Sequence, residues 1–265
     1  MTRVSIITVS FNDLAGLKET RASVLRQVSS GDIEHIVIDG GTGPAVEAFL
    51  ASQADLTWRS EPDQGIYDAM NKGLELATGD VYWFMNSGDT FASSDSIDVV
   101  LRTIDSPRES WGYGFSRFFD ENGDFRWLHG HVPFRFFFLA TGFMTLPHQA
   151  SFFGADLVQK VGRYSLDFPI SADQLFMIQC ARLTSPIVIP EMLCNFDMTG
   201  VSSRLGVHQH FKDMRKALRV TGVKITRYRI LDYAVSIALE AIRAFTRTAG
   251  RMSRRSGPIG NIASG

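Results

Sequence analysis

Short apolar segments rich in β-branched residues alternate with segments of helical periodicity over the first 85 residues of this chain. The predicted strands and helices follow one another in the order 4–9, 14–28, 35–38, 45–51, 56–58, 67–77 and 81–85. A strand, a helix and a further strand in succession form the βαβ unit, whose strands are parallel and whose crossover is right-handed. The alternation therefore predicts an α/β fold with an open, doubly wound sheet, in which ligands bind beyond the carboxyl ends of the strands.

Polar residues follow three of the predicted strands at these carboxyl ends. They are the segment 10–12, Asp39 and the segment 86–89. Their common position is the first indication of a ligand site. Neither a phosphate-binding loop ending in Gly-Lys-Ser/Thr nor a Gly-x-Gly-x-x-Gly sequence follows the first strand, so the usual ATP and dinucleotide sites lack their signatures.

The chain between residues 95 and 143 departs from this alternation. A helix is expected over 95–103, and segments 112–119 and 125–128 flank a turn-rich stretch that favours a hairpin. The Phe-rich segment 133–143 has few charges and no clear period. It is either core beneath a lid or an apolar acceptor groove, and core is favoured because apolar clusters are usually interior.

Charge is distributed unevenly along the chain. The formal net charge of −1 gives no reason to expect nucleic acid as the main partner, yet from residue 204 onward Lys and Arg far outnumber Asp213, Asp232 and Glu240. The apolar runs within 228–245 are far shorter than the ~20 residues that span a bilayer. We expect an amphipathic helix, and the segment 228–255 either meets an anionic membrane surface or packs on the catalytic domain or a second subunit.

Only Cys180 and Cys194 are present, which excludes a disulfide framework and a metal site built from three or more thiolates. The first strand follows Met1 closely, without a cationic leader, a long apolar stretch and a cleavage site. We therefore expect a cytoplasmic protein, at the inner face of the cell membrane where the amphipathic helix binds lipid.

A carboxylate follows the buried strand 81–85 within the sequence Asn86-Ser87-Gly88-Asp89. Hard divalent cations such as Mg²⁺ or Mn²⁺ bind a few protein oxygens and complete their shell with water and phosphate oxygens. Asp89, together with a bound diphosphate, would suffice to hold such a cation. An Asp in this position is also a common turn former, and the residues alone leave both interpretations open.

The sequences SIITVSFN, VIDGG, SEPDQGIYDAMNKGLELATGD and WFMNSGD occur in this order. This order resembles the N-terminal half of the family 2 inverting glycosyltransferases, in particular those that build bacterial cell-surface polysaccharides and glycolipids. The resemblance is close over residues 3–115 and continues more weakly to about 205. It implies a GT-A fold with a Rossmann-like mixed sheet and a metal-dependent, hexosyltransferase-type enzyme.

The resemblance also implies an organisation of the chain. Residues 1–205 would form the catalytic domain, with the nucleotide-sugar donor bound by 1–115 and a saccharide or glycolipid acceptor by 116–205. The composition of the remaining chain predicts a helical, basic extension over 206–250 and a disordered tail over 251–265.

Positions of the donor site can be carried over one by one. Thr8, Ser10 and Asn12 would line the nucleotide pocket, and Asp39 would accept a hydrogen bond from the base. The other implied donor-side residues are Glu61 and Asp63 in a loop, Asn71 and Lys72 on a helix facing the diphosphate, and Asn86. Asp89 matches the last acid of the family's Asp-x-Asp metal motif. Two positions depart from the family pattern: Ser87 replaces the first acid, and Thr42-Gly43-Pro44 replaces the commoner Ser-Thr-Asp.

On the acceptor side, segment 170–175 resembles the part of the family that supplies the catalytic base, which assigns this role to Asp173. The alternative is a helix N-cap at Asp173 with Ala172 outside the helix. His148 would lie near the acceptor or the diphosphate, although a lone His is more often a structural hydrogen-bonding residue. Ser202, within the Gly- and Ser-containing loop 199–203, would close over the bound donor.

Two other functions remain open at this point. A nucleotidyltransferase or sugar-nucleotide pyrophosphorylase also uses a doubly wound sheet and metal-bound carboxylates, but its usual Gly-rich, basic N-terminal segment is missing. The loss of the first metal acid at Ser87 would suit a non-catalytic module that binds nucleotide sugars.

Overall fold

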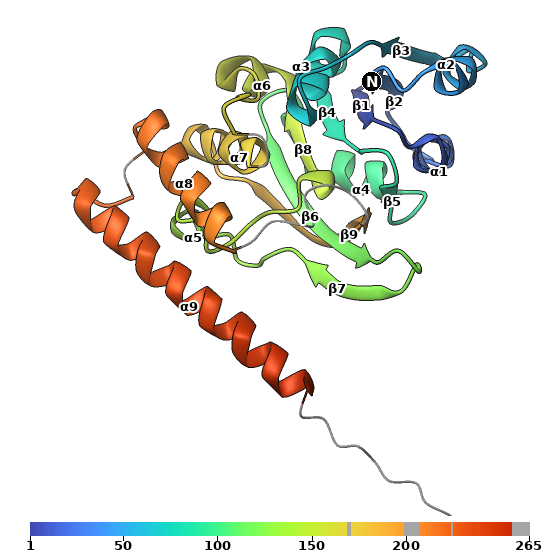
Figure 1. Cartoon of the computed structure of the whole chain (residues 1–265). Helices are drawn as coiled ribbons and strands as arrows, with labels where there is room; N and C mark the ends of the chain where they lie inside the picture. The colour runs from blue at the N-terminus through green and yellow to red at the C-terminus, as the bar shows by residue number, and fades with distance from the viewer. Residues whose placement is uncertain (169–170, 199–206, 224, 256–265) are drawn as a thin grey trace, which may run out of the picture. The chain divides into compact units, whose positions relative to one another are not determined.

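The computed structural model describes residues 1–168, 171–198, 207–223 and 225–255 (Figure 1). Its contacts divide the chain into two compact units. One unit contains Met1–Phe136 and Thr145–Arg204, and the other contains Phe137–Met144 and Leu205–Gly265.

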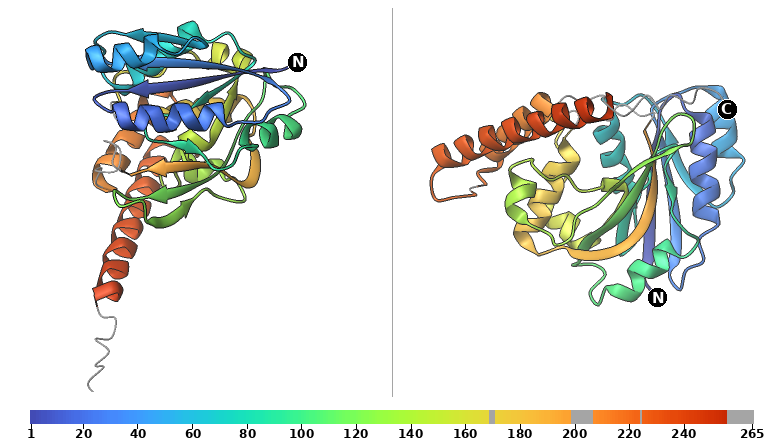
Figure 2. Two further views of the ribbon diagram at one scale, coloured as in Figure 1. Left: turned by 90° about the vertical axis from the view of Figure 1, so that its right-hand side faces the viewer. Right: turned by 90° about the horizontal axis from the view of Figure 1, so that it is seen from below.

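The first unit is built on one sheet with helices on both of its faces (Figure 2). The strands are β1 Arg3–Ser10, β2 Asp32–Asp39, β3 Leu56–Ser60, β4 Val81–Phe84, β5 Thr90–Phe91, β6 Trp111–Phe119, β7 Phe125–His129, β8 Ser151–Gly154 and β9 Ile187–Asp197. The helices of this unit are α1 Leu14–Leu25, α2 Pro44–Ala51, α3 Ile66–Leu76, α4 Ser96–Thr103, α6 Ala155–Val161 and α7 Ala172–Leu183, with a short 3₁₀ turn, η1, at His148–Ala150.

The sheet is mixed, with the order β3-β2-β1-β4-β8-β6-β9-β5 and with β7 paired to β6. Strands β1 to β4 are parallel to one another, which confirms the predicted α/β fold. Strand β8 is antiparallel to both of its neighbours, β4 and β6. The predicted hairpin is confirmed by the antiparallel pairing of β6 with β7.

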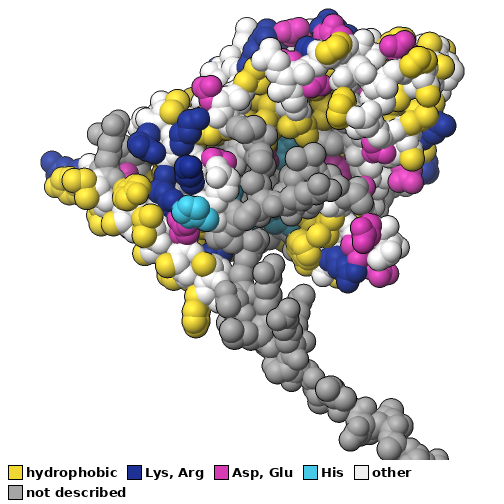
Figure 3. Space-filling view, viewed as in Figure 1, with side chains coloured by type: hydrophobic (Ala, Val, Ile, Leu, Met, Phe, Trp, Pro, Cys, Tyr) yellow, Lys and Arg dark blue, Asp and Glu magenta, His cyan; other side chains and the backbone are white. Residues whose placement is uncertain are grey.

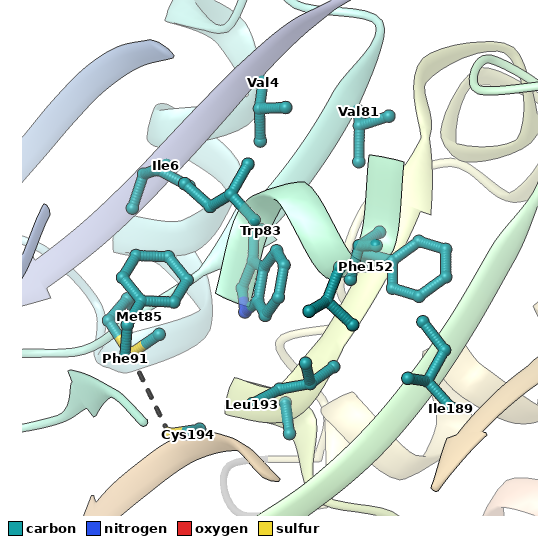
Figure 4. Close-up of a cluster of buried hydrophobic side chains, with 14 of the residues drawn as sticks. Val4, Ile6, Val81, Trp83, Met85, Phe91, Phe152, Ile189, Leu193 and Cys194 are labelled. Atoms are coloured by element: carbon teal, nitrogen blue, oxygen red, sulfur yellow. Dashed lines mark hydrogen bonds between the residues drawn. The ribbon is translucent and has the colours of Figure 1, made fainter. Parts of the chain in front are cut away.

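Strands β1, β2 and β4 are mostly buried and largely apolar because helices cover both of their faces. On one face α3 lies so close to β1 that a side chain at Gly73 would collide with Ile7. On the other face Leu17 of α1 packs with Val46 of α2. A second cluster on this face joins strands β1, β4, β8 and β9 around Trp83 (Figure 4). Each large apolar side chain buried there contributes about 1.5–3 kcal/mol to stability.

The structure differs from two local predictions. The predicted helix 14–28 ends at Leu25, and the backbone N–H of Val28 instead donates to the Ser94 carbonyl at 2.7 Å. The Phe-rich segment 133–143 contains the short helix α5, Phe136–Ala140. Its Leu139 and Ala140 are fully buried whereas Phe137 is exposed, so the segment contributes to the core only in part.

A series of contacts between polar side chains connects α1 to β1 and β2. The Thr8 hydroxyl lies 3.0 Å from His35 Nε2, and Arg21 contacts His35 Nδ1 at 3.2 Å. Arg21 also pairs with Asp55. Burial and the neighbouring Arg21 charge lower the pKa of His35 to about 3, so its ring is neutral at pH 7.

The second unit contains two long helices, α8 Val207–Thr221 and α9 Arg229–Arg255. They are joined by the ion pair Arg215–Glu240, with 2.6 Å between Nη1 and Oε2. Helix α9 includes residues 251–255, for which the sequence predicted a tail, and 256–265 lie outside the described residues. Among the described helices, none combines the length and the apolar content that crossing a bilayer requires.

The buried His35 predicts a pH dependence of stability. Unfolding restores a pKa near 6.5, so between pH 6.5 and about 3 the unfolded chain binds a proton that the folded chain does not. The unfolding free energy should therefore fall as the pH is lowered from 6.5 to 4, by up to about 1.4 kcal/mol per pH unit from this residue. Urea unfolding at several pH values should show a smaller slope for His35→Gln than for the original chain.

An independent measurement is the NMR titration of the His35 ring in the folded chain, which should show no protonation between pH 7 and 5. Equal pH slopes for the two proteins, together with a ring that titrates near pH 6.5, would contradict the assignment.

Candidate functional site

Hydrogen bonds join the loops that follow the parallel strands. The N–H of Gly40 donates to the Ser10 carbonyl at 2.9 Å, and the N–H of Ser87 donates to the Val9 carbonyl at 3.0 Å. The N–H of Glu61 donates to the Asp39 carbonyl at 3.0 Å. The polar segments at the ends of β1, β2 and β4 therefore lie side by side at one edge of the sheet.

Asp39 is fully buried at the end of β2 and organises the loop behind it. Its Oδ2 accepts hydrogen bonds from the N–H groups of Gly41 and Thr42, at 3.1 and 2.8 Å, and from the Ser60 hydroxyl at 2.8 Å. Its Oδ1 accepts from the Thr42 hydroxyl at 2.5 Å. Oδ1 therefore accepts from one of these four donors and Oδ2 from three, so Oδ1 is the less occupied oxygen.

Thr42 replaces the commoner residue of the family and connects two loops. Besides binding Asp39, its hydroxyl accepts from the Asn12 N–H at 3.0 Å. Asn12 has a φ of 55°, a left-handed conformation that Asn tolerates better than most residues. In the sequence Thr42-Gly43-Pro44, Thr42 thus forms hydrogen bonds to both loops, and helix α2 starts at Pro44.

Phe11 is an exposed aromatic residue among these polar groups, with 65% of its surface accessible. Its Cδ2 atom and Asp63 Oδ2 both lie within 3 Å of the position that a Cβ of Gly40 would occupy. Only glycine allows both groups to approach so closely. Phe11 was not among the residues predicted from the sequence for this site, although an aromatic residue inside a polar strand-end segment is unusual.

Lys72 lies over the loop that follows β3. Its ammonium group is 3.1 Å from Glu61 and 3.4 Å from Asp68, and it donates to the Pro62 carbonyl at 3.0 Å. Asp63 accepts from the Gly65 N–H at 2.8 Å through Oδ1. The structure thus brings three of the predicted donor-side residues, Glu61, Asp63 and Lys72, into one loop region.

Two predicted donor-side residues make contacts inside the protein instead. Thr8 is fully buried and contacts His35. Asn71 is also buried, and its amide binds the backbone of Tyr164 through both functional groups, at 2.9 and 2.8 Å. These contacts fasten β1 to β2 and α3 to the segment after α6, so both side chains have structural roles in the fold.

The turn 86–89 is held from α1 by a single hydroxyl group. Thr20 Oγ1 lies 3.0 Å from the carbonyl of Asn86 and 2.7 Å from that of Asp89, and it accepts from the Gly88 N–H at 3.1 Å. Ser87 donates to Asp13 Oδ2 at 2.8 Å, so a carboxylate is present next to the position where the family motif has its first acid.

Asp89 itself is 3% exposed. Its Oδ1 accepts from the Asp197 N–H at 2.9 Å. Burial and the nearby negative charge of Asp197 raise the pKa of Asp89 well above its usual range. On the same turn, Asn86 Oδ1 is buried without a hydrogen-bonding partner in the described part of the chain. A buried carboxylate and an unsatisfied amide oxygen are suitable ligands for a hard cation.

These oxygens do not form a complete metal cage of protein ligands. Within residues 1–168, 171–198, 207–223 and 225–255, no group of three or more His, Cys, Asp or Glu side chains is arranged to hold a metal ion. Any cation at Asp89 would therefore take further oxygens from a bound anion or from water.

Asp173 lies in the first turn of α7, whose N-cap is Ser171. The alternative in which Asp173 caps the helix from outside is therefore wrong. The Tyr67 hydroxyl donates to Asp173 Oδ1 at 2.9 Å, and the Gln174 amide donates to Oδ2 at 3.1 Å. Burial and the Asp173 charge raise the pKa of Tyr67 well above 10, so this hydroxyl stays a proton donor to the carboxylate.

His148 belongs to a buried aromatic layer. Its Nε2 lies 2.8 Å from the Tyr164 hydroxyl, and its ring stacks on Phe84 with 5.0 Å between centroids. Burial lowers the pKa of His148 to about 4, although the Asp173 charge acts in the opposite direction. The ring is neutral at pH 7, as a structural hydrogen-bonding residue would be. Ser202, the other predicted residue of this group, lies outside the described residues.

Similar proteins were found at both the sequence and the structure level. An uncharacterized glycosyltransferase of Mycobacterium tuberculosis H37Rv is 43% identical over 218 residues, which are 80% of this chain and 82% of the relative. A PGL/p-HBAD biosynthesis glycosyltransferase of Mycobacterium bovis BCG is 30% identical over 181 residues, 66% of this chain and 68% of the relative.

Solved structures with low sequence identity share the fold. S. aureus TarS 1-349 in complex with UDP aligns with a TM-score of 0.63 at 14% identity, over 87% of this chain and 68% of that one. The chain spans only 41% of a longer TarS chain. The mannosyltransferase PcManGT from Pyrobaculum calidifontis, in complex with GDP-Man and Mn²⁺, aligns with a TM-score of 0.59 at 17% identity, over 97% of this chain and 76% of that one.

The sequence profile described as Glycosyl transferase family 2 matches residues 5–159, which are more than half of the chain and include most of β1, all of β2 to β4 and the turn that carries Asp89. With this match and the 43% identical relative, the chain belongs to glycosyl transferase family 2, as its sequence motifs predicted.

Proposed function

We propose that this protein transfers a sugar from a nucleoside diphosphate donor to a saccharide or glycolipid acceptor, with inversion, in the synthesis of cell-surface polysaccharide or glycolipid. The observation that carries the proposal is the buried Asp89 carboxylate on a turn that adjoins the loops after β1 and β2. Residues 1–115 would bind the donor and 116–205 the acceptor.

The printed names of related proteins support both substrate classes. The relatives named for PGL/p-HBAD biosynthesis are 30% identical to this chain and favour a glycolipid acceptor. The TarS complexes with UDP and UDP-GlcNAc, and the PcManGT complex with GDP-Man, favour a nucleotide-sugar donor.

The donor base would lie at the end of β2. An N–H of the base would donate to Asp39 Oδ1, the carboxylate oxygen that accepts from fewer donors inside the protein. The exposed Phe11 ring would stack on the base, since stacking on an aromatic face accommodates any base. Ser10, whose hydroxyl is buried without a partner among the described residues, and Asn12 would complete this pocket.

The diphosphate would lie between Lys72 and the turn that carries Asn86 and Asp89. A divalent cation at this point supplies a Lewis acid that offsets the charge growing on the departing diphosphate. Asp89 and Asn86 would hold it through their side-chain oxygens. Ser87, which suggested a non-catalytic module, is accommodated because its hydroxyl binds the Asp13 carboxylate.

Asp173 would act as the general base. The acceptor oxygen forms a bond to the anomeric carbon as the bond from that carbon to the diphosphate oxygen breaks, and the acceptor proton passes to Asp173. The hydrogen bonds from Tyr67 and Gln174 fix the orientation of the carboxylate. One displacement inverts the anomeric centre, so no enzyme nucleophile is required.

Replacement of Asp89 tests the cation site. Asp89→Asn keeps the shape of the side chain but removes its charge, and turnover should fall at least about 100-fold because several kcal/mol of transition-state stabilisation are lost. The thermal midpoint of the metal-free protein should not fall, since burial already disfavours the charged carboxylate. The matched control is Asp105→Asn, at an exposed position, which should keep full activity.

Sugar transfer by the original chain should also stop in excess chelator and return when Mn²⁺ is added. Full activity in chelator would refute a cation at Asp89.

Replacement of Asp173 tests the base. Asp173→Asn should lower kcat by about 10²–10⁴-fold while the dissociation constant of the donor changes little, because the carboxylate acts on the acceptor proton. Tyr67→Phe, which removes only the orienting hydrogen bond, should lower kcat less. Both effects are measured by steady-state kinetics together with donor titration calorimetry, with the exposed Glu109→Gln as control. Equal losses in kcat and donor affinity would make Asp173 a binding residue instead.

A further inference from the structure

Helix α9 carries its apolar side chains on the outside. The exposed large hydrophobic residues of this helix are Ile230, Leu231, Tyr233, Ile237, Ile242 and Phe245. Ile230 and Phe245 are 86% and 74% accessible. In the space-filling view, hydrophobic side chains gather along the described part of α9 (Figure 3). A helix on the surface of a globular protein normally has the opposite orientation, with its apolar stripe turned inward.

Two acidic residues of the same helix, Asp232 and Glu240, contact other parts of the second unit instead. Asp232 accepts hydrogen bonds from the N–H groups of Ile225 and Thr226, at 3.1 and 2.6 Å. Glu240 pairs with Arg215 of α8. These contacts fix the rotation of α9 about its axis, because turning the apolar side inward would break an ion pair and two hydrogen bonds.

The apolar side is wide and uninterrupted. At 100° per residue, the six exposed residues span about half of the helix circumference between residues 230 and 245, a length of about 24 Å. The charged residues of this stretch are Asp232, Glu240 and Arg243, and all three are buried or half-buried. Asp232 and Arg243 lie on the opposite side of the helix, and Glu240 lies at the edge of the apolar side. An exposed apolar surface of this size is typical of a site that binds another protein or a membrane.

The charge of the second unit distinguishes between two possible partners of the apolar side, a second copy of this unit and a lipid surface. From Leu205 to the C-terminus the sequence contains twelve Lys or Arg and three acids, a formal excess of nine positive charges. Two copies of this unit placed face to face would repel each other, whereas a surface of anionic lipid headgroups would attract it. No described helix is long and apolar enough to cross a bilayer, so α9 would lie along the surface.

We propose that α9 lies in the interfacial layer of an anionic membrane, with the side formed by Ile230, Tyr233, Ile237 and Phe245 in the acyl region and the basic residues of the unit at the headgroups. This surface is independent of the sugar-transfer chemistry. Where the proposed function holds as well, it would place the enzyme on the membrane in which a glycolipid acceptor resides.

The test is sedimentation of the full chain with vesicles of phosphatidylcholine alone or with 30% phosphatidylglycerol. The original chain should bind the anionic vesicles at least about tenfold more tightly than the neutral ones, and added salt should weaken this binding. The double variant Ile230→Glu/Ile237→Glu should lose at least about tenfold in affinity while its helix content, from circular dichroism, stays the same. Val28→Glu, which changes an exposed apolar residue of the first unit, is the matched control and should bind as the original chain does.

Three results would overturn the proposal: no binding to either vesicle, equal binding by the double variant, or a stable dimer without lipid that the double variant dissociates. The last would assign the apolar side of α9 to a second copy. Transfer to a water-soluble acceptor serves as the separate readout of the proposed function. It should be unchanged in the double variant, so failure of membrane binding and failure of catalysis can be told apart.

Discussion

Parallel pairing of β1 with both β2 and β4 is the interaction on which the site depends. The register places Ser10 beside Asp39 and Ile7 beside Phe84, so the loops after these strands must leave the sheet at the same edge. Backbone hydrogen bonds between strand ends then join the loops to one another. Because helices bury both faces of these strands, that edge is where their polar residues can meet a ligand.

Most of the parallel part of the sheet, β1 to β4, could be predicted from the sequence. Helices connect its successive strands, and the hydrophobic periodicity of these strands and helices is visible in the sequence. The other part could not. Strand β8 is inserted antiparallel between β4 and β6, and β9 lies parallel to β6 across more than sixty residues of chain. Such pairings depend on which edges remain open after the first strands assemble, and no short sequence pattern records that. The hairpin of β6 and β7 was predictable because its turn is local.

Contacts between residues far apart in sequence also limit what could be predicted about single side chains of the site. Asp39 and Asp89 were expected at strand ends and lie there. Thr8 and Asn71 look equally suitable in the sequence, but they bind His35 and the Tyr164 backbone inside the protein. Polarity alone does not distinguish a side chain aimed at a ligand from one that satisfies a buried partner, because the partner lies far away in sequence. The alternative of an N-cap at Asp173 was open for a related reason: Ser171 and Asp173 are both good capping residues.

The Thr20 hydroxyl has a consequence for the affinity of the site. One fully buried side chain on α1 contacts the backbone of Asn86, Gly88 and Asp89, and the Asp197 N–H holds the Asp89 carboxylate from β9. The turn is therefore ordered by the fold itself, and the entropy lost in ordering it is lost when the chain folds. A ligand that arrives at this preorganised turn keeps more of its contact free energy as binding affinity, because no loop has to be immobilised at that moment.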